Sequence, residues 1–195
     1  MNDIVIRVVK VGGSLFDLPD LPARIIDRLA AQPSGLNIIV AGGGERVEEL
    51  RQAEKAVPLT TVGYHWLCVR ALATTAEILA EWLRPLPFIR GFDELQATIS
   101  FRLPSTCIFD VFEFLHEHEG QLPGEVLPQD WSVTSDSIAA RLARVIDADE
   151  LVLFKSATVP AGSSLEDLAK QGYVDAFFPQ AAEELPLVRL VNLRD

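Results

Sequence analysis

Apolar residues along this chain gather in short runs that alternate with amphipathic segments. The runs at 4–11, 36–41 and 151–154 are rich in valine, isoleucine and leucine, which predicts buried strands. Over 21–29, leucine and isoleucine recur every four residues and predict a helix between the first two strands. A strand, a helix and a second strand without a hairpin signal favour a parallel crossover. We therefore expect an α/β fold whose mainly parallel sheet is covered by helices on both faces.

A long helical pattern covers 61–83 and ends before two prolines. A helix of this length crosses a whole domain or forms a subunit contact, so we expect a homodimer or a higher homo-oligomer. The pattern is least regular over 88–129, where we expect a strand at 107–109, a short helix at 111–118 and substrate-specific structure. Because no repeat or low-complexity linker interrupts the sequence, residues 1–195 are predicted to form a single domain.

Capping residues mark several of the other elements. Asp20 is placed to cap the first helix, and Ser164 begins a pattern similar to a capping box that Gly172 ends. A polar stretch at 135–137 is placed to cap a further helix that carries apolar residues at helical spacing. A last strand is predicted at 188–193.

Composition narrows the classes of partner. The 195 residues are 49% hydrophobic and 23% charged, which is typical of a globular protein. A formal net charge of −11 argues against nucleic acid as a partner, and a site for anions must then be locally positive. The two cysteines are far apart in the sequence, which favours reduced thiols and a cytoplasmic protein. No signal peptide or membrane-spanning stretch is predicted, so we expect no membrane partner.

Two glycine clusters follow the first two predicted strands. The first contains Gly12, Gly13 and Ser14, and the second runs over 42–44. A glycine turn before a helix lets main-chain N–H groups face an anion, so the pair predicts a phosphate site. Lys10 ends the first strand at the edge of the sheet where ligands bind in open α/β folds. The alternatives are two tight turns without a ligand and a lysine that snorkels to solvent.

Several common site patterns are absent from the sequence. It contains neither GxxxxGK[ST] nor GxGxxG, because Val47 stands where the second pattern needs its last glycine. His116 and His118 are spaced two residues apart and diverge on a helix, so we predict no metal ligands among the side chains.

Three motifs nevertheless resemble the amino acid kinase superfamily. They are KVGGS at Lys10–Ser14, AGGGE at Ala41–Glu45 and TSDSIAA at Thr134–Ala140. Within that superfamily the chain is most similar to the small aminomethylfuran phosphate kinase branch of methanofuran synthesis, a route in one-carbon metabolism. WSVTSDS at Trp131–Ser137 is the most specific of these likenesses, and His65 also resembles that branch.

The resemblance implies a fold, an activity and roles for particular residues. It implies a three-layer αβα sandwich and ATP-dependent phosphoryl transfer, which in this branch converts a phosphate monoester to a diphosphate. Lys10 then stabilises the transferring group, and Asp136 orients lysines and lies near the metal. The glycines that hold phosphates correspond to Gly12, Gly13, Gly43 and Gly44. Of the remaining candidates, phosphate contacts are expected from Gly42, Ser14, Thr134 and Ser135, and acceptor contacts from His65.

The chemistry of phosphoryl transfer agrees with these roles. It depends on positioning and charge neutralisation, so the absence of a nucleophile triad is expected. The cofactors implied are ATP and Mg²⁺, with Mg²⁺ held largely by phosphates and water. Purely structural roles remain as alternatives, since Asp136 is also placed to cap a helix and His65 to pack within one.

Two stretches depart from the superfamily pattern. Many members read Thr-Asp-x-x-Gly after the strand that corresponds to 151–154, whereas this chain reads Lys155–Thr158. Many also carry a second catalytic lysine in the stretch that corresponds to Gly172–Pro179, which contains none here. We hypothesise that Lys155 replaces it, because Lys155 also ends a predicted strand. The alternative is a solvated lysine at a strand end.

These observations lead to one principal hypothesis and two rivals. The principal hypothesis is a kinase that uses ATP and Mg²⁺ on a small phosphorylated or carboxylated metabolite, with aminomethylfuran phosphate as the specific candidate. The first rival is a non-catalytic module of the same fold that binds an anion or a nucleotide. The second is a doubly wound dinucleotide-binding protein, which predicts affinity for NAD.

Overall fold

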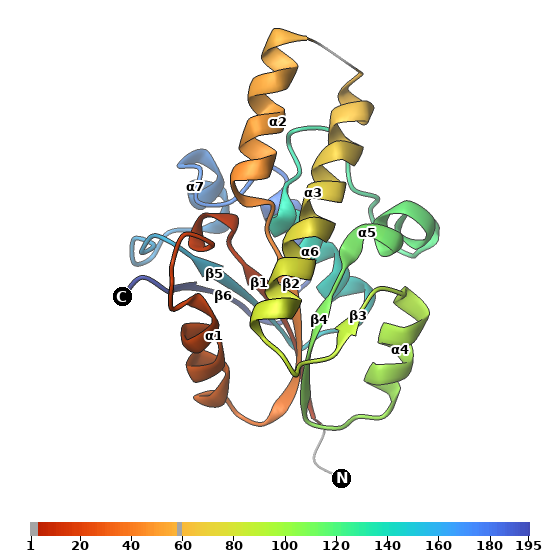
Figure 1. Ribbon diagram of the computed structural model, residues 1–195, viewed down its shortest axis with the longest axis vertical. Coiled ribbons are helices and arrows are strands. Elements are labelled where there is room, and N and C mark those ends of the chain that lie inside the picture. Colours follow the sequence, from red (N-terminus) through yellow and green to blue (C-terminus); the bar gives the residue numbers. More distant parts are fainter. Residues whose placement is uncertain (1–3, 58–59) are drawn as a thin grey trace.

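The computed structural model describes residues 4–57 and 60–195 and contains one twisted sheet (Figure 1). In the described residues the sheet has six strands, all parallel, in the spatial order β3-β4-β2-β1-β5-β6. The strands are β1 (Val5–Val11), β2 (Gly35–Ala41), β3 (Phe88–Ile89), β4 (Ser105–Phe109), β5 (Glu150–Lys155) and β6 (Val188–Asn192). The predicted α/β class and parallel sheet are therefore confirmed.

Helices connect the strands in the crossovers that parallel pairing requires. The α-helices are α1 (Leu21–Ala30), α2 (Gly44–Ala56), α3 (Thr61–Trp82), α4 (Phe92–Ser100), α5 (Val111–Glu113), α6 (Ser135–Val145), α7 (Leu165–Lys170) and α8 (Phe178–Ala181). Three short helical turns complete the set: the 3₁₀ turn η1 (Gly13–Leu15), the π-helical turn η2 (Phe114–His118) and the 3₁₀ turn η3 (Glu119–Gln121).

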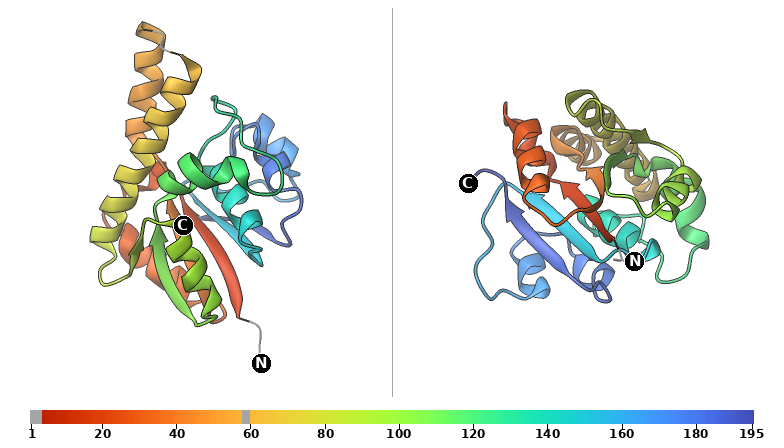
Figure 2. Two further views of the ribbon diagram at one scale, coloured as in Figure 1. Left: turned by 90° about the vertical axis from the view of Figure 1, so that its right-hand side faces the viewer. Right: turned by 90° about the horizontal axis from the view of Figure 1, so that it is seen from below.

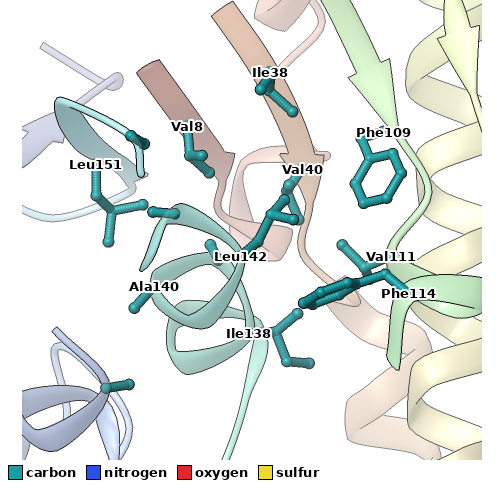
Figure 3. Close-up of a cluster of buried hydrophobic side chains, with 14 of the residues drawn as sticks. Val8, Ile38, Val40, Phe109, Val111, Phe114, Ile138, Ala140, Leu142 and Leu151 are labelled. Atoms are coloured by element: carbon teal, nitrogen blue, oxygen red, sulfur yellow. The ribbon is translucent and has the colours of Figure 1, made fainter. Parts of the chain in front are cut away.

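The two faces of the sheet bury two separate apolar clusters, which gives the expected three layers (Figure 2). Successive strand side chains point to opposite faces, so Val8 joins one cluster and Val9 the other. Ile138 and Leu142 of α6 pack on the first face, where Figure 3 shows them against side chains of the central strands. Helix α1 covers the opposite face together with Ala76 and Leu79 of α3, whereas Val69 and Leu72 of α3 belong to the first cluster.

The order of the strands places a crevice at the centre of the sheet. From β1 the chain goes to β2, then to the edge strand β3, and then back to β4 between β3 and β2. It afterwards crosses to the other side of β1 for β5 and β6. The direction of the connections thus reverses between β1 and β5. Ligands in open α/β sheets bind beyond the carboxyl ends of the strands at such a reversal. Lys10 and Lys155 lie at the carboxyl ends of these two strands.

Most predicted elements are confirmed with small shifts of their ends. The long helix predicted over 61–83 is α3. Asp20 occupies the N-cap position of α1, but its side chain does not cap the helix and instead pairs with Arg24 at 2.8 Å. Ser164 does cap α7, since its Oγ accepts from the main-chain N–H of Asp167 at 3.1 Å.

The segment 88–129 differs from its expected role. Instead of substrate-specific structure it supplies β3 and β4 at one edge of the sheet, together with α4 and α5. Phe92, Phe109 and Phe114 from this segment are fully buried in the cluster beneath α6. The segment therefore extends the core, which explains its many apolar residues.

Helices α2 and α3 form a hairpin that stands out from the rest of the molecule (Figure 1). Helix α2 contains no buried residue, and its first residue, Gly44, is the last residue of the second glycine cluster. Among the described residues, no helix is both long enough and apolar enough to cross a lipid bilayer.

Candidate functional site

The two glycine turns touch each other at the carboxyl edge of β1 and β2. A Cβ atom built on Gly13 would lie 2.1 Å from the main-chain nitrogen of Gly44, and one on Gly42 would lie 2.6 Å from the nitrogen of Gly13. Gly44 also has φ of +60°, a conformation that side chains other than glycine rarely adopt. Glycine is therefore required here because the two turns pack main chain against main chain.

The amides of the turns divide into two groups. Gly12 N donates to Phe154 O at 2.8 Å, and Gly42 N donates to Val11 O at 2.8 Å. These two amides extend the sheet, so they are not available to a ligand. Any phosphate contacts from the turns therefore fall to Gly13, Ser14 and the start of α2.

A cleft of about 1000 Å³ opens above the turns. Of the sequence-predicted site residues, those that line it are Gly13, Ser14, Gly43, Gly44, His65, Thr134 and Ser135. None of the described residues of 88–129 does so, which agrees with the role of that segment in the core. The cleft combines main-chain glycines, polar side chains and apolar residues of α3, a composition typical of small-molecule sites.

The three predicted catalytic residues, Lys10, Asp136 and Lys155, do not line this cleft, although Ser135 beside Asp136 does. Asp136 bridges the two strand-end lysines. Lys155 Nζ donates to Asp136 Oδ2 at 2.6 Å, and Lys10 Nζ lies 2.9 Å from Oδ1. The second contact is an ion pair without the alignment of a hydrogen bond. Lys10 and Asp136 are almost fully buried, whereas 15% of the Lys155 side chain is exposed. The lysines therefore converge on one carboxylate, as the replacement hypothesis requires.

Burial and the neighbouring charges both shift the pKa values of Asp136 and Lys155. Burial alone raises the pKa of Asp136, but the two lysines outweigh it and lower the pKa below its ordinary value of 3.8. Burial also lowers the pKa of Lys155 below 10.5, and the like charge of Lys10 lowers it further despite the attraction of Asp136. The ion-pair cluster itself holds two lysines and one carboxylate, and a second carboxylate, Asp175, also acts on Lys155.

The start of α6 is fixed by a residue that the sequence analysis did not identify. Asp175 accepts hydrogen bonds from Thr134 N at 2.9 Å and from Thr134 Oγ1 at 2.7 Å, and it also contacts Ser137. Thr134 Oγ1 additionally accepts from Asp136 N at 3.4 Å, so its hydroxyl is used within the protein. Thr134 therefore lines the cleft without a hydroxyl proton to offer a phosphate.

Two arginines that no sequence motif indicates, Arg194 and Arg51, also line the cleft. Arg194 donates to Ser14 O at 2.8 Å and pairs with Asp17 at 2.7 Å, which ties the last residues to the first glycine turn. Arg51 of α2 lies 4.8 Å from the centroid of the Trp131 ring, and both residues line the cleft. Neither arginine belongs to a recognisable motif, so only the fold reveals their position.

The remaining predicted residues lie in different surroundings. Ser14 Oγ forms a 2.8 Å hydrogen bond with Ser156 Oγ, which joins the first turn to the residue after Lys155. His65 of α3 is half-buried in the cleft, and burial lowers its pKa although Asp130 opposes the shift. His118 lies outside the cleft and contacts Glu113 at 3.1 Å.

Comparisons with known proteins agree with this arrangement. No protein-family model matches the chain. Over 148 residues it is 24% identical to [5-(aminomethyl)furan-3-yl]methyl phosphate kinase of Methanocaldococcus jannaschii, a match that covers 75% of this chain. The match spans 64% of that relative, less than two thirds of its length.

Solved structures resemble the whole chain. UMP kinase from Ureaplasma parvum has a TM-score of 0.66 at 14% identity, covering 98% of this chain and 91% of its own. Uridylate kinase from Archaeoglobus fulgidus has a TM-score of 0.62 at 16% identity, with 97% and 93% covered. Aspartate kinase from Synechocystis has a TM-score of 0.59 at 13% identity, with 95% and 38% covered. The chain therefore has the amino acid kinase fold, and its predicted resemblance to the amino acid kinase superfamily is confirmed.

Proposed function

We propose that this protein is a small-molecule kinase that transfers the terminal phosphoryl group of ATP to a phosphorylated metabolite. The observation that carries the proposal is the bridge from Asp136 to both Lys10 and Lys155, next to two glycine turns that face a cleft. Phosphoryl transfer needs fixed positive charge and main-chain donors around the transferring group, and this site combines both.

Each part of the site has a role in the proposed reaction. The lysines neutralise charge on the transferring group, and Asp136 holds their ammonium groups in place. Gly13, with Gly43 and Gly44 at the start of α2, offers main-chain donors to phosphate oxygens, where the positive end of the helix dipole adds to the attraction. His65 lines the same cleft and is our candidate for contact with the acceptor.

The residues of the cleft fit a nucleotide whose metal is held by its own phosphates. Main-chain atoms of Gly44 occupy the space that a side chain at residue 13 would need. A ligand at this point would therefore contact main-chain atoms of the two turns. Among the described residues, the one close group of three potential metal ligands is Glu113, Glu117 and His118, and it lies outside the cleft. Mg²⁺ would therefore be held by phosphates and water, and it would neutralise charge on them.

The proposed step balances without a strong general base. An oxygen of the acceptor phosphate attacks the γ-phosphorus of ATP, the bond from that phosphorus to the β-phosphate oxygen breaks, and ADP leaves. A phosphate monoester has its second pKa near 6, so its attacking oxygen already carries negative charge near neutral pH. The products are a diphosphate and ADP. This chemistry explains a site that has lysines and no nucleophile–base pair.

For the acceptor we propose [5-(aminomethyl)furan-3-yl]methyl phosphate, the compound named for the relative from Methanocaldococcus jannaschii. The sequence likeness in WSVTSDS and the placement of His65 in the cleft support this choice. A homo-oligomer is also part of the proposal, because α3 exposes Val62, Leu67 and Trp82. The free thiols of Cys68 and Cys107 support a reducing compartment such as the cytoplasm.

An assay with several acceptors tests the proposed function. Purified protein is incubated with ATP and Mg²⁺ and with the furan phosphate, UMP or aspartate, while ADP release and phosphorus NMR are followed. We expect ADP release with the furan phosphate together with the paired signals of a diphosphate. Calorimetric binding of ATP without turnover on any acceptor would favour the binding module instead. Affinity for NAD would favour the dinucleotide-binding rival.

The lowered pKa of Lys155 predicts how turnover depends on pH. If its ammonium form is needed, kcat/KM for ATP falls as the pH rises through that pKa, so the midpoint of the alkaline limb lies below 10.5. In Lys155→Arg the guanidinium stays charged, and the limb is expected to move to higher pH or disappear. A pH series of kcat/KM for both proteins measures this. An identical limb in both would assign it to a different group.

A further inference from the structure

A carboxylate from a distant part of the chain accepts hydrogen bonds from the first turn of α6. Asp175 follows α7 and lies 41 residues after Thr134. Its Oδ2 accepts from Thr134 N, from Thr134 Oγ1 and, at 3.1 Å, from Ser137 N, while its Oδ1 accepts from Ser137 Oγ. Both oxygens are therefore used to hold the beginning of this one helix.

The main chain next to Asp175 adds a second attachment. Phe177 N donates to Ser132 O at 3.1 Å, just before α6 begins. A capping box satisfies the first turn with an acidic residue three positions after the cap, but that position is Ser137 here. The acid comes instead from Asp175, so the position of this helix start depends on the segment between α7 and α8.

This helix start carries the residue on which the candidate site depends. Asp136 lies between the two residues that Asp175 holds, and it is 3% exposed. Each of its oxygens faces a different lysine, at 2.9 and 2.6 Å. A small shift of the turn would break both contacts, and a misplacement of about 1 Å in a catalytic site costs on the order of 10²-fold in rate.

Asp175 also acts on Lys155 through its charge. The charged groups that face Lys155 are Lys10 from β1, Asp136 from α6 and Asp175 from the segment after α7. Burial lowers the pKa of Lys155 most and Lys10 lowers it further, whereas the two carboxylates raise it. The carboxylate of Asp175 thus favours the charged form of a lysine that the proposed reaction uses.

We infer that Asp175 is a positioning residue for phosphoryl transfer, which fixes the start of α6 so that Asp136 aligns Lys10 and Lys155. This inference rests on the proposed function. It also implies that the main-chain N–H groups of Thr134 and Ser137 do not bind phosphate, because the carboxylate of Asp175 already accepts from both. The phosphates are then held at the glycine turns and the lysines.

Replacing Asp175 with asparagine tests the inference in the full-length chain. Asp175→Asn loses the charge and replaces one of the two acceptor oxygens with an NH₂ donor, so we expect kcat to fall about 10–100-fold while KM for ATP changes less than about threefold. The alkaline limb of kcat/KM for ATP is expected to move to lower pH, because a carboxylate that favours the charged form of Lys155 is lost. Asp27→Asn removes the same charge from an exposed position of α1 and serves as the matched control, with wild-type kinetics expected.

A milder variant separates the effect of the hydrogen bonds of Asp175 from the effect of its charge. It also keeps the inference testable if Asp175→Asn does not fold. Ser137→Ala removes one hydrogen bond to Asp175 but leaves its charge, so we expect a loss in kcat of a few-fold with an unchanged alkaline limb. Thermal unfolding curves of all variants give the fraction of each protein that is folded at the assay temperature. Wild-type kcat per folded molecule and an unshifted limb in Asp175→Asn would overturn the inference.

Failure of the proposed function gives a different result. If the wild-type protein turns over no acceptor, the kinase proposal fails, and binding of pyrophosphate is measured by calorimetry instead. Weaker binding by Asp175→Asn than by wild type at alkaline pH would then support the positioning of the lysines by Asp175. Equal binding by the two proteins would overturn it.

Discussion

Replacing Lys10 with alanine is expected to reduce kcat about 10²–10³-fold, the usual cost of losing one donor to a developing charge in a transition state. The reason is its position: Lys10 ends β1 at the reversal of the sheet and lies 2.9 Å from Asp136. Asp136 keeps Lys155 as a partner in this variant, so the buried carboxylate is not left unpaired. Steady-state kinetics with ATP and the furan phosphate measure the effect.

Two further variants make the result for Lys10 specific. Lys10→Met fills most of the volume of the lysine without its charge and is expected to lose the same amount of activity as Lys10→Ala. Lys170→Ala removes an exposed lysine of α7 and is expected to behave as wild type. Retained turnover in Lys10→Met would show that Lys10 serves the fold and not the reaction.

The pairing of the two lysines follows from the alternation of side chains in strands. Lys10 comes two residues after Val8, and Lys155 comes four residues after Leu151, so each lysine points to the same face of the sheet as that apolar residue. The side chains of Val8 and Leu151 pack on the face that α6 covers. Once β1 and β5 are known to be neighbours, both lysines must point toward α6. The sequence therefore predicts the direction of each side chain, whereas only the fold shows that the strands are adjacent.

Other features are less visible in the sequence. The two-residue strand β3 is too short for a periodic signal, and its partner β4 lies between it and β2 in space although it follows both in the chain. Asp175 is separated from α6 by the whole of β5 and α7, so no local pattern indicates that it holds this helix. Tertiary contacts of this kind decide the positions of the site residues, and motifs indicate only which residues to examine.

The contact between the glycine turns can be tested with a single methyl group. In Gly13→Ala the new Cβ would meet the main-chain nitrogen of Gly44 at 2.1 Å and its Cα at 2.5 Å, so one turn has to move. We expect a loss of about 3 kcal/mol in the free energy of unfolding, because main-chain atoms do not yield as a flexible side chain does. For a chain of this size, that corresponds to roughly 6–12 °C in the unfolding temperature.

Folded Gly13→Ala is also expected to bind its ligand more weakly than the wild-type protein does. The turns face the cleft through the residues that the methyl group displaces, so affinity for ATP with Mg²⁺ should decrease more than about tenfold even where the protein is fully folded. Gly120→Ala is the matched control, since a Cβ there meets no atom within 4 Å. Calorimetric titration of both variants below their unfolding temperatures compares them. Wild-type affinity in folded Gly13→Ala would show that the nucleotide does not bind at these turns, and the proposed site would then be wrong.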